Sequence, residues 1–85
     1  MKERTVVIAS ASGLHARPAK LFTTAAAGTG VKIAKGEDEP VDAASILRVM
    51  SLGIAHGDTV VLSGEDESAL DSLADLLAKD LDAEP

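Results

Sequence analysis

Hydrophobic and polar residues alternate in short blocks along the chain, and the blocks predict seven elements. Runs of β-branched and apolar residues between turn residues are typical of strands. Apolar residues that recur every three or four positions are typical of amphipathic helices. The predicted strands span residues 5–9, 31–34, 40–42 and 59–62, and the predicted helices span residues 16–27, 45–52 and 68–82.

Each predicted helix has an apolar stripe that indicates its buried side. Ser45 is a good N-cap for the second helix, in which Ile46 and Val49 can face the core. Pro40 places the strand at 40–42 on a sheet edge, where a missing N–H is tolerated. The stripe residues of the first and last helices are Ala19, Phe22 and Ala26, and Leu70, Leu73, Leu77 and Leu81.

The element order βαββαβα with short connections predicts one domain over residues 1–85. Hairpins and crossovers in this order favour an α+β fold of two layers. We expect an open-faced β-sandwich, in which a four-stranded antiparallel sheet carries three helices on one face.

The amino-acid composition excludes several classes of function. Phe22 is the single aromatic residue and the net charge is −6, so the stacking platforms and basic footprint of a nucleic-acid-binding protein are missing. Without cysteine the chain has no disulfide or thiol chemistry. It contains no apolar signal core and no run long enough to span a bilayer, and we expect it in the cytoplasm.

Charge is distributed unevenly along the sequence. Residues 1–35 carry six basic residues and one acidic residue, whereas residues 36–85 carry two basic and thirteen acidic residues. Such a separation predicts a dipolar surface, which serves solubility and does not by itself identify a partner.

One segment, residues 13–19 (Gly-Leu-His-Ala-Arg-Pro-Ala), carries candidate chemistry between the first strand and the first helix. The first N–H groups of a helix lack partners within the helix and, together with the helix dipole, favour an anion. Gly13 permits a tight bend, and Pro18 falls in the first helical turn, where its missing N–H costs nothing. Arg17 can donate charge-assisted hydrogen bonds to an oxyanion at the same place.

His15 is therefore a candidate nucleophile. A helix N-terminus disfavours a protonated imidazole, so the ring can remain neutral near pH 7. A phosphoryl group on the ring would be favoured by the dipole by about 0.3–1 kcal/mol, and a hydrogen bond from Arg17 would add about 1.5–3 kcal/mol. These modest values suit a carrier. The alternative, in which His15 only caps the helix, leaves the surrounding Gly, Arg and Pro unexplained.

The segment resembles the active-site motif of the histidine-containing phosphocarrier protein (HPr) family of the bacterial phosphoenolpyruvate:sugar phosphotransferase system. Residues 44–54 are similar to the family's regulatory-serine helix, and residues 64–70 are similar to the turn into its last helix. The resemblance covers essentially the whole chain and has the same βαββαβα order.

The resemblance implies a carrier that is not a self-sufficient enzyme and has no metal or cofactor of its own. His15 would accept a phosphoryl group on Nδ1 from phospho-enzyme I, which draws it from phosphoenolpyruvate. It would pass the group to the IIA units of sugar permeases. Arg17 would stabilise the phosphoryl charge, and Ser12 and the backbone N–H of Ala16 would line the site. We expect a monomer that binds these partners and does not insert into a membrane.

The resemblance also implies a docking surface on the first two helices. Leucine and methionine at helical spacing usually belong to a core, but the second helix is short and has other apolar residues for its buried side. Methionine suits an adaptable contact surface. The implied docking residues are Ala16, Arg17, Lys20, Leu47 and Met50.

Ser45 aligns with the serine that a dedicated kinase phosphorylates in some bacteria, so a serine kinase or phosphorylase and regulators are further candidate partners. Here Ala44, Asp42 and Arg48 stand where many members have Lys, Asn and Gly. A plain N-cap role for Ser45, worth about 1 kcal/mol, explains the residue equally well. His56 has no acidic or basic neighbour in its turn other than Asp58, and we expect it to be structural or solvent-exposed.

Two other classes fit part of the sequence. An acyl carrier protein would share the length and acidity, and residues 71–73 (Asp-Ser-Leu) look like a phosphopantetheine attachment triplet. Such a triplet should open a mid-chain helix of an all-helical bundle, and three residues make a weak motif. A small ligand-binding or regulatory domain of ferredoxin-like topology leaves His15, Arg17 and Pro18 unexplained. A family member acting in regulation or nitrogen metabolism would have the same sequence features.

Overall fold

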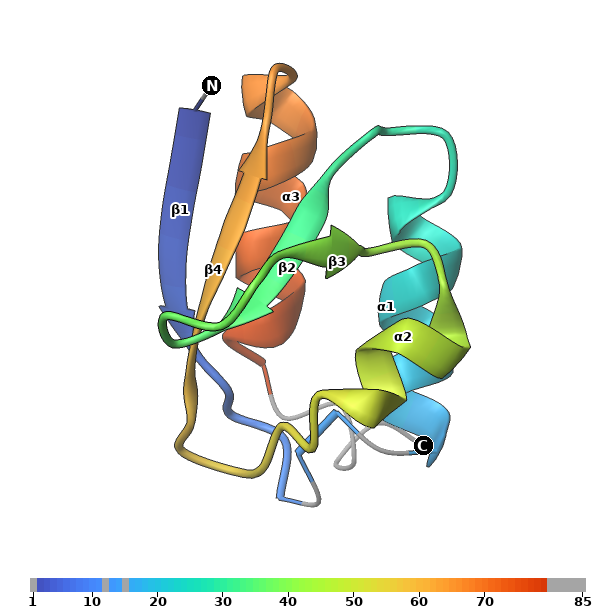
Figure 1. Cartoon of the computed structure of the whole chain (residues 1–85), viewed down its shortest axis with the longest axis vertical. Coiled ribbons are helices and arrows are strands. Elements are labelled where there is room, and N and C mark those ends of the chain that lie inside the picture. Colours follow the sequence, from blue (N-terminus) through green and yellow to red (C-terminus); the bar gives the residue numbers. More distant parts are fainter. Residues whose placement is uncertain (1, 12, 15, 80–85) are drawn as a thin grey trace.

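Seven elements follow one another in the computed structural model, which describes residues 2–11, 13–14 and 16–79 and, of Ala16, the backbone alone (Figure 1). His15, Ser12, Leu81 and the C-terminal residues 80–85 lie outside the described residues, and so do the expectations that fall on them. The elements are β1 (Lys2–Val7), α1 (Ala16–Ala26), β2 (Lys32–Lys35), β3 (Val41–Asp42), α2 (Ile46–Ser51), β4 (Thr59–Gly64) and α3 (Glu67–Leu77).

The strands form one antiparallel sheet in the order β1-β4-β2-β3. β4 is central: Val60 lies opposite Val6 of β1 on one side and opposite Lys35 of β2 on the other. The three helices cover one face, with α3 behind β1 and β4, and with α1 and α2 packed against each other (Figure 1). The predicted α+β open-faced sandwich is confirmed. A four-stranded sheet also excludes the all-helical bundle of an acyl carrier protein.

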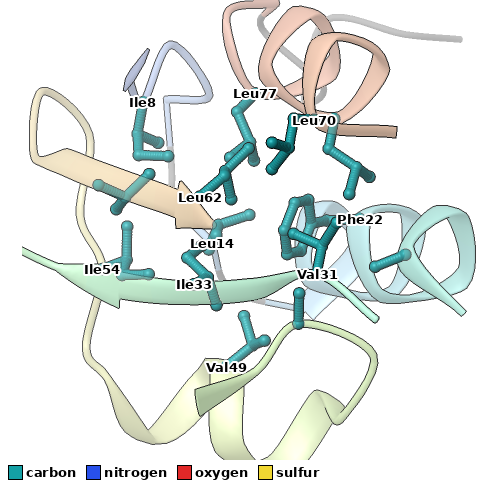
Figure 2. Close-up of a cluster of buried hydrophobic side chains, with 14 of the residues drawn as sticks. Ile8, Leu14, Phe22, Val31, Ile33, Val49, Ile54, Leu62, Leu70 and Leu77 are labelled. Atoms are coloured by element: carbon teal, nitrogen blue, oxygen red, sulfur yellow. The ribbon is translucent and has the colours of Figure 1, made fainter. Parts of the chain in front are cut away.

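The core lies between the inner face of the sheet and the helices (Figure 2). Phe22 of α1, Leu62 of β4 and Leu70 of α3 are all fully buried and point into the same interior. Because their side chains come from three elements far apart in sequence, burying them joins the two layers. The predicted stripes are confirmed for Ala19, Phe22, Ala26, Leu70, Leu73 and Leu77.

The first strand begins and ends earlier than the pattern predicts. It was expected over residues 5–9 and covers Lys2–Val7, because the whole of β4 pairs with it, from Gly64 opposite Lys2 to Thr59 opposite Val7. Ile8 and Ala9 leave the ladder: the N–H of Ile8 bonds to the Asp58 carbonyl, and that of Ala9 to the Leu77 carbonyl.

The last helix is also shorter than its apolar stripe predicts. The helix ends at Leu77, and the expected extension to residue 82 is wrong for Ala78 and Lys79. The Leu77 carbonyl accepts from the N–H of Ala9 at 3.1 Å, a tertiary bond that ties the end of α3 to the chain that follows β1. The other element boundaries lie within two residues of the predicted ones.

Ion pairs connect the polar start of β1 to α3. Arg4 Nε donates to Asp71 Oδ1 at 2.8 Å. The Glu67 carboxylate forms ion pairs with Lys2 at 3.5 Å and with Arg4 at 3.6 Å. Two acidic residues of α3 therefore hold the edge strand β1. Of the helices that the structure describes, none combines the length and apolar character needed to cross a membrane.

Candidate functional site

The site is built at the point where the chain leaves β1 and enters α1. Gly13 has a φ of 72° and is buried, and a Cβ at this position would collide with the carbonyl oxygen of Ile54 and lie 2.7 Å from the Cα of Ala55. Only glycine combines this backbone conformation with this close approach. The predicted tight bend at Gly13 is confirmed, and its partner is the turn that precedes β4.

Leu14 anchors the chain immediately before His15. Its side chain is 2% exposed within the core, and its N–H donates to the Ile54 carbonyl at 3.1 Å. The helix α1 then begins at Ala16, so one residue separates a buried anchor from the first helical residue. The N-terminus of α1, the end of a helix that favours an anion, is thus held close to a buried anchor in the chain.

The first turn of α1 separates one buried residue from two exposed cations. Pro18 is buried within this turn, as predicted, whereas Arg17 and Lys20 are exposed. The first turn of α1 contains no acidic residue, so the positive end of the helix dipole is not offset by a neighbouring carboxylate there. This end of α1 is suited to an anion.

The two helices α1 and α2 pack together (Figure 1). Both carry exposed apolar side chains. Leu47 is 80% exposed and Met50 36% exposed, which confirms that this pair lies outside the core. Ile46 was expected to be buried and is 38% exposed: α2 has six residues, and Val49 is its one buried residue. We call the exposed residues Arg17, Lys20, Leu21, Ile46, Leu47 and Met50 the α1–α2 surface.

Leu21 was missed as a member of this surface because it adjoins the buried stripe of α1. Its 38% exposure places it with Arg17 and Lys20, which lie four and one positions earlier in the helix. The helical spacing to Arg17 was the signal in the sequence that could have identified it.

Ser45 lies at the N-terminus of α2. Its side chain accepts from the N–H of Arg48 at 3.4 Å, which confirms the N-cap role. Asp42 accepts from the N–H of Ala44 at 2.9 Å and so shapes the turn before the cap. A surface depression of about 510 Å³ is lined by Ser45, Lys32, Arg48, Asp42, Glu39, Pro40 and Val41.

Polar contacts of Asp58 and Lys35 support the turn at residues 53–58. The Asp58 carboxylate accepts from the N–H of Ala55 at 2.8 Å and pairs with the Lys35 ammonium at 3.3 Å, while Lys35 also donates to the Gly53 carbonyl at 3.0 Å. The backbone bond from Ala55, followed by the contact with Lys35, lowers the pKa of the Asp58 carboxyl below its usual range. Sequence reasoning missed Lys35 because its partners are remote in the chain.

The imidazole of His56, in the same turn, contacts the segment that precedes the site. Nδ1 of His56 lies 3.2 Å from the carbonyl oxygen of Ser10, which also accepts from the N–H of Gly13 at 2.9 Å. The structural role expected of His56 is therefore a contact with the Ser10 carbonyl.

The fold and the site together define a class: a small open-faced sandwich in which a buried glycine bend delivers a His-Ala-Arg-Pro segment to a helix N-terminus. A family model described as "PTS HPr component phosphorylation site" matches residues 2–79. The chain therefore belongs to the HPr family, the phosphocarriers of the phosphotransferase system.

Individual relatives agree with this assignment. The phosphocarrier protein HPr of Streptomyces coelicolor is 47% identical over 90 residues, covering 100% of this chain and 97% of its own. The phosphocarrier protein HPr of Haloferax volcanii is 44% identical over 82 residues, covering 89% and 92%. The crystal structure of HPr-C-His from Thermoanaerobacter tengcongensis is 39% identical, with a TM-score of 0.88 and full coverage of both chains.

Proposed function

We propose that His15 accepts a phosphoryl group from phospho-enzyme I and transfers it to the IIA units of sugar permeases. The observation that carries the proposal is the family match, whose description is a phosphorylation site, together with the Gly-Leu-His-Ala-Arg-Pro segment inside it. Residues on both sides of His15 are held by the fold: Leu14 by burial and a hydrogen bond, and Ala16 by its place in α1.

The proposed roles of neighbouring residues follow from charge and position. Arg17 stabilises the phosphoryl group by charge-assisted hydrogen bonds, and the N–H of Ala16, with Ser12, lines its oxygens. In the transfer step, the imidazole nitrogen forms a bond to phosphorus while the bond to the donor's group breaks. The next acceptor then forms a bond to phosphorus while the nitrogen–phosphorus bond breaks, so the carrier returns unchanged.

We further propose that partners dock on the α1–α2 surface. This surface combines the exposed apolar side chains of Leu47 and Met50 with the exposed cations Arg17 and Lys20. This pattern fits partner surfaces that are apolar with an acidic rim, although the chain as a whole carries a net charge of −6. The proposal places the carrier in the cytoplasm as a monomer.

The direct test is the intact mass of the protein after incubation with phosphoenolpyruvate, magnesium and purified enzyme I. We expect one added phosphoryl group that is lost in acid and is absent from the His15→Ala variant. An unmodified mass, with an enzyme I shown to be active on another HPr, would refute the sugar-system assignment. The enzyme I of the nitrogen branch would then be the next donor to use.

A further inference from the structure

His56 occupies a position from which it can control the chain that leads into the phosphoryl site. Its turn lies against the chain between β1 and α1: Ile54 accepts from the N–H of Leu14, and the N–H of Gly57 donates to the Ile8 carbonyl at 2.9 Å. These contacts are made by backbone atoms. His56 adds a side-chain contact to the same interface, from Nδ1 to the Ser10 carbonyl at 3.2 Å.

The chemistry of this contact specifies the tautomer of the ring. A carbonyl oxygen can only accept a hydrogen bond, so Nδ1 of His56 must carry the hydrogen. In the neutral ring this leaves Nε2 without one. The Ser10 carbonyl thus receives two donors, Nδ1–H of His56 and the N–H of Gly13 at 2.9 Å.

We propose that His56 is a positioning residue of the phosphoryl site and acts through the Ser10 carbonyl. The inference rests on the proposed function of His15. Ser10 and Gly13 close the bend whose exit is the buried Leu14, and α1 begins two residues further on. A donor that fixes the Ser10 carbonyl therefore fixes the direction from which the chain enters the site. Small displacements at a reacting group have large effects on rate.

The expected effect is moderate because His56 is exposed, so its imidazole can also bond to water. A net hydrogen bond of ordinary strength corresponds to about a two- to tenfold change. Loss of the imidazole should slow phosphoryl transfer by that factor without altering binding to enzyme I, since His56 does not belong to the α1–α2 surface. The effect should appear in kcat, while KM for the carrier stays the same.

Three variants separate positioning from general stability. His56→Ala removes the donor. His56→Asn restores it, because the side-chain amide nitrogen of asparagine is a donor close to the place of Nδ1. Ser68→Ala is the matched control, since Ser68 is exposed in the first turn of α3, which follows the end of β4 remote from the 53–58 turn.

The first measurement does not depend on phosphorylation. Imidazole ¹⁵N shifts of the wild-type protein should show the Nδ1–H tautomer for neutral His56. Exchange of the Gly13 amide should accelerate about two- to tenfold in His56→Ala and return toward the wild-type rate in His56→Asn. The Nε2–H tautomer, or unchanged exchange in His56→Ala, would overturn the proposed contact whether or not His15 is phosphorylated.

The second measurement is steady-state phosphorylation by enzyme I and phosphoenolpyruvate. We expect a lower kcat for His56→Ala, recovery in His56→Asn, and wild-type values for Ser68→Ala. Equal kcat values for all four proteins would show that the contact does not position the site and would overturn the inference. If the wild-type protein accepts no phosphoryl group at all, the proposed function fails, and the inference that rests on it falls as well.

Discussion

Lys35 of β2 and Asp58, immediately before β4, form an ion pair of 3.3 Å. Lys35 also donates to the Gly53 carbonyl, and Asp58 accepts from the N–H of Ala55, so the pair closes the 53–58 turn from both ends. The 53–58 turn also contacts Gly13 and Leu14 through Ile54. An interaction on the sheet is therefore connected to the proposed phosphoryl site through one turn.

The first prediction is a loss of stability in acid that depends on Asp58. In the folded protein its pKa is lowered below its usual range by the hydrogen bond from the N–H of Ala55 and then by Lys35, so the charged carboxylate stabilises the fold above the unfolded-state pKa. This contribution is lost as the pH falls through the lower, folded-state pKa. The free energy of unfolding from urea titrations between about pH 5 and about pH 2.5 should therefore fall less steeply in Asp58→Asn than in the wild type. Identical slopes would show that Asp58 has no such role.

The second prediction concerns Gly13. In Gly13→Ala, a left-handed backbone costs about 1–2 kcal/mol, and the clash with Ile54 and Ala55 adds about 1–3 kcal/mol. Gly28→Ala is the matched control: Gly28 has a φ of 79°, but a Cβ there meets no atom within 4 Å. Thermal or urea unfolding should therefore show a clearly larger destabilisation for Gly13→Ala. Equal losses would mean that the contact with the 53–58 turn carries no energy.

The third prediction separates chemistry from docking on α1. Arg17→Ala removes charge-assisted hydrogen bonds worth about 1.5–3 kcal/mol, which corresponds to about ten- to a hundredfold slower phosphoryl transfer. Some acceptance should persist because the helix N-terminus is unchanged. Lys20→Ala, one turn later and also exposed, should mainly raise KM. Stopped-flow or steady-state kinetics with enzyme I would give kcat and KM for both variants. A normal kcat in Arg17→Ala would contradict the proposed role of Arg17 in stabilising the phosphoryl group.

The fourth prediction tests the α1–α2 surface. Leu47 is 80% exposed, so Leu47→Asp should leave the fold intact while placing a charge in the apolar centre. Binding to enzyme I or a IIA unit, measured by calorimetry, should weaken by at least about tenfold. Val7, 56% exposed on β1, provides the control variant Val7→Asp. Similar affinities for the two variants would exclude Leu47 from the interface.

The fifth prediction distinguishes the two interpretations of Ser45. Ser45→Ala should lower the free energy of unfolding by about 1 kcal/mol, because the N–H of Arg48 loses its cap. Ser45→Asp should keep the stability, since aspartate is an equally good N-cap, but should weaken docking through its added charge next to the α1–α2 surface. Unaltered docking by Ser45→Asp would leave Ser45 with the capping role alone.

The sequence predicted element types well because the stripes of α1 and α3 and the β-branched run of β4 obey simple periodicity. It failed where a tertiary partner decides the outcome. The charged residues Lys2 and Arg4 lie in a strand because β4 supplies hydrogen bonds along its full length. The end of α3 at Leu77 coincides with a tertiary hydrogen bond from the N–H of Ala9 to the Leu77 carbonyl.

The proposed site, too, could be predicted only where the local sequence determines it. The segment 13–19 could be identified from local chemistry, since glycine, arginine and proline each have a positional reason there. The supporting residues Lys35 and His56 could not, because their partners lie 18 and 46 positions away in the chain. No local pattern records a contact across such a distance.

The sheet has two free edges, formed by β1 and β3, and each edge is protected in a different way. β3 has only two residues and follows Pro40, while β1 begins with Lys2, Glu3 and Arg4, two of which are held by α3. Short or charged edges are poor templates for the strand of another molecule. The protein can therefore be concentrated without joining sheet to sheet, which leaves the exposed apolar side chains on the helices for the partners that we propose.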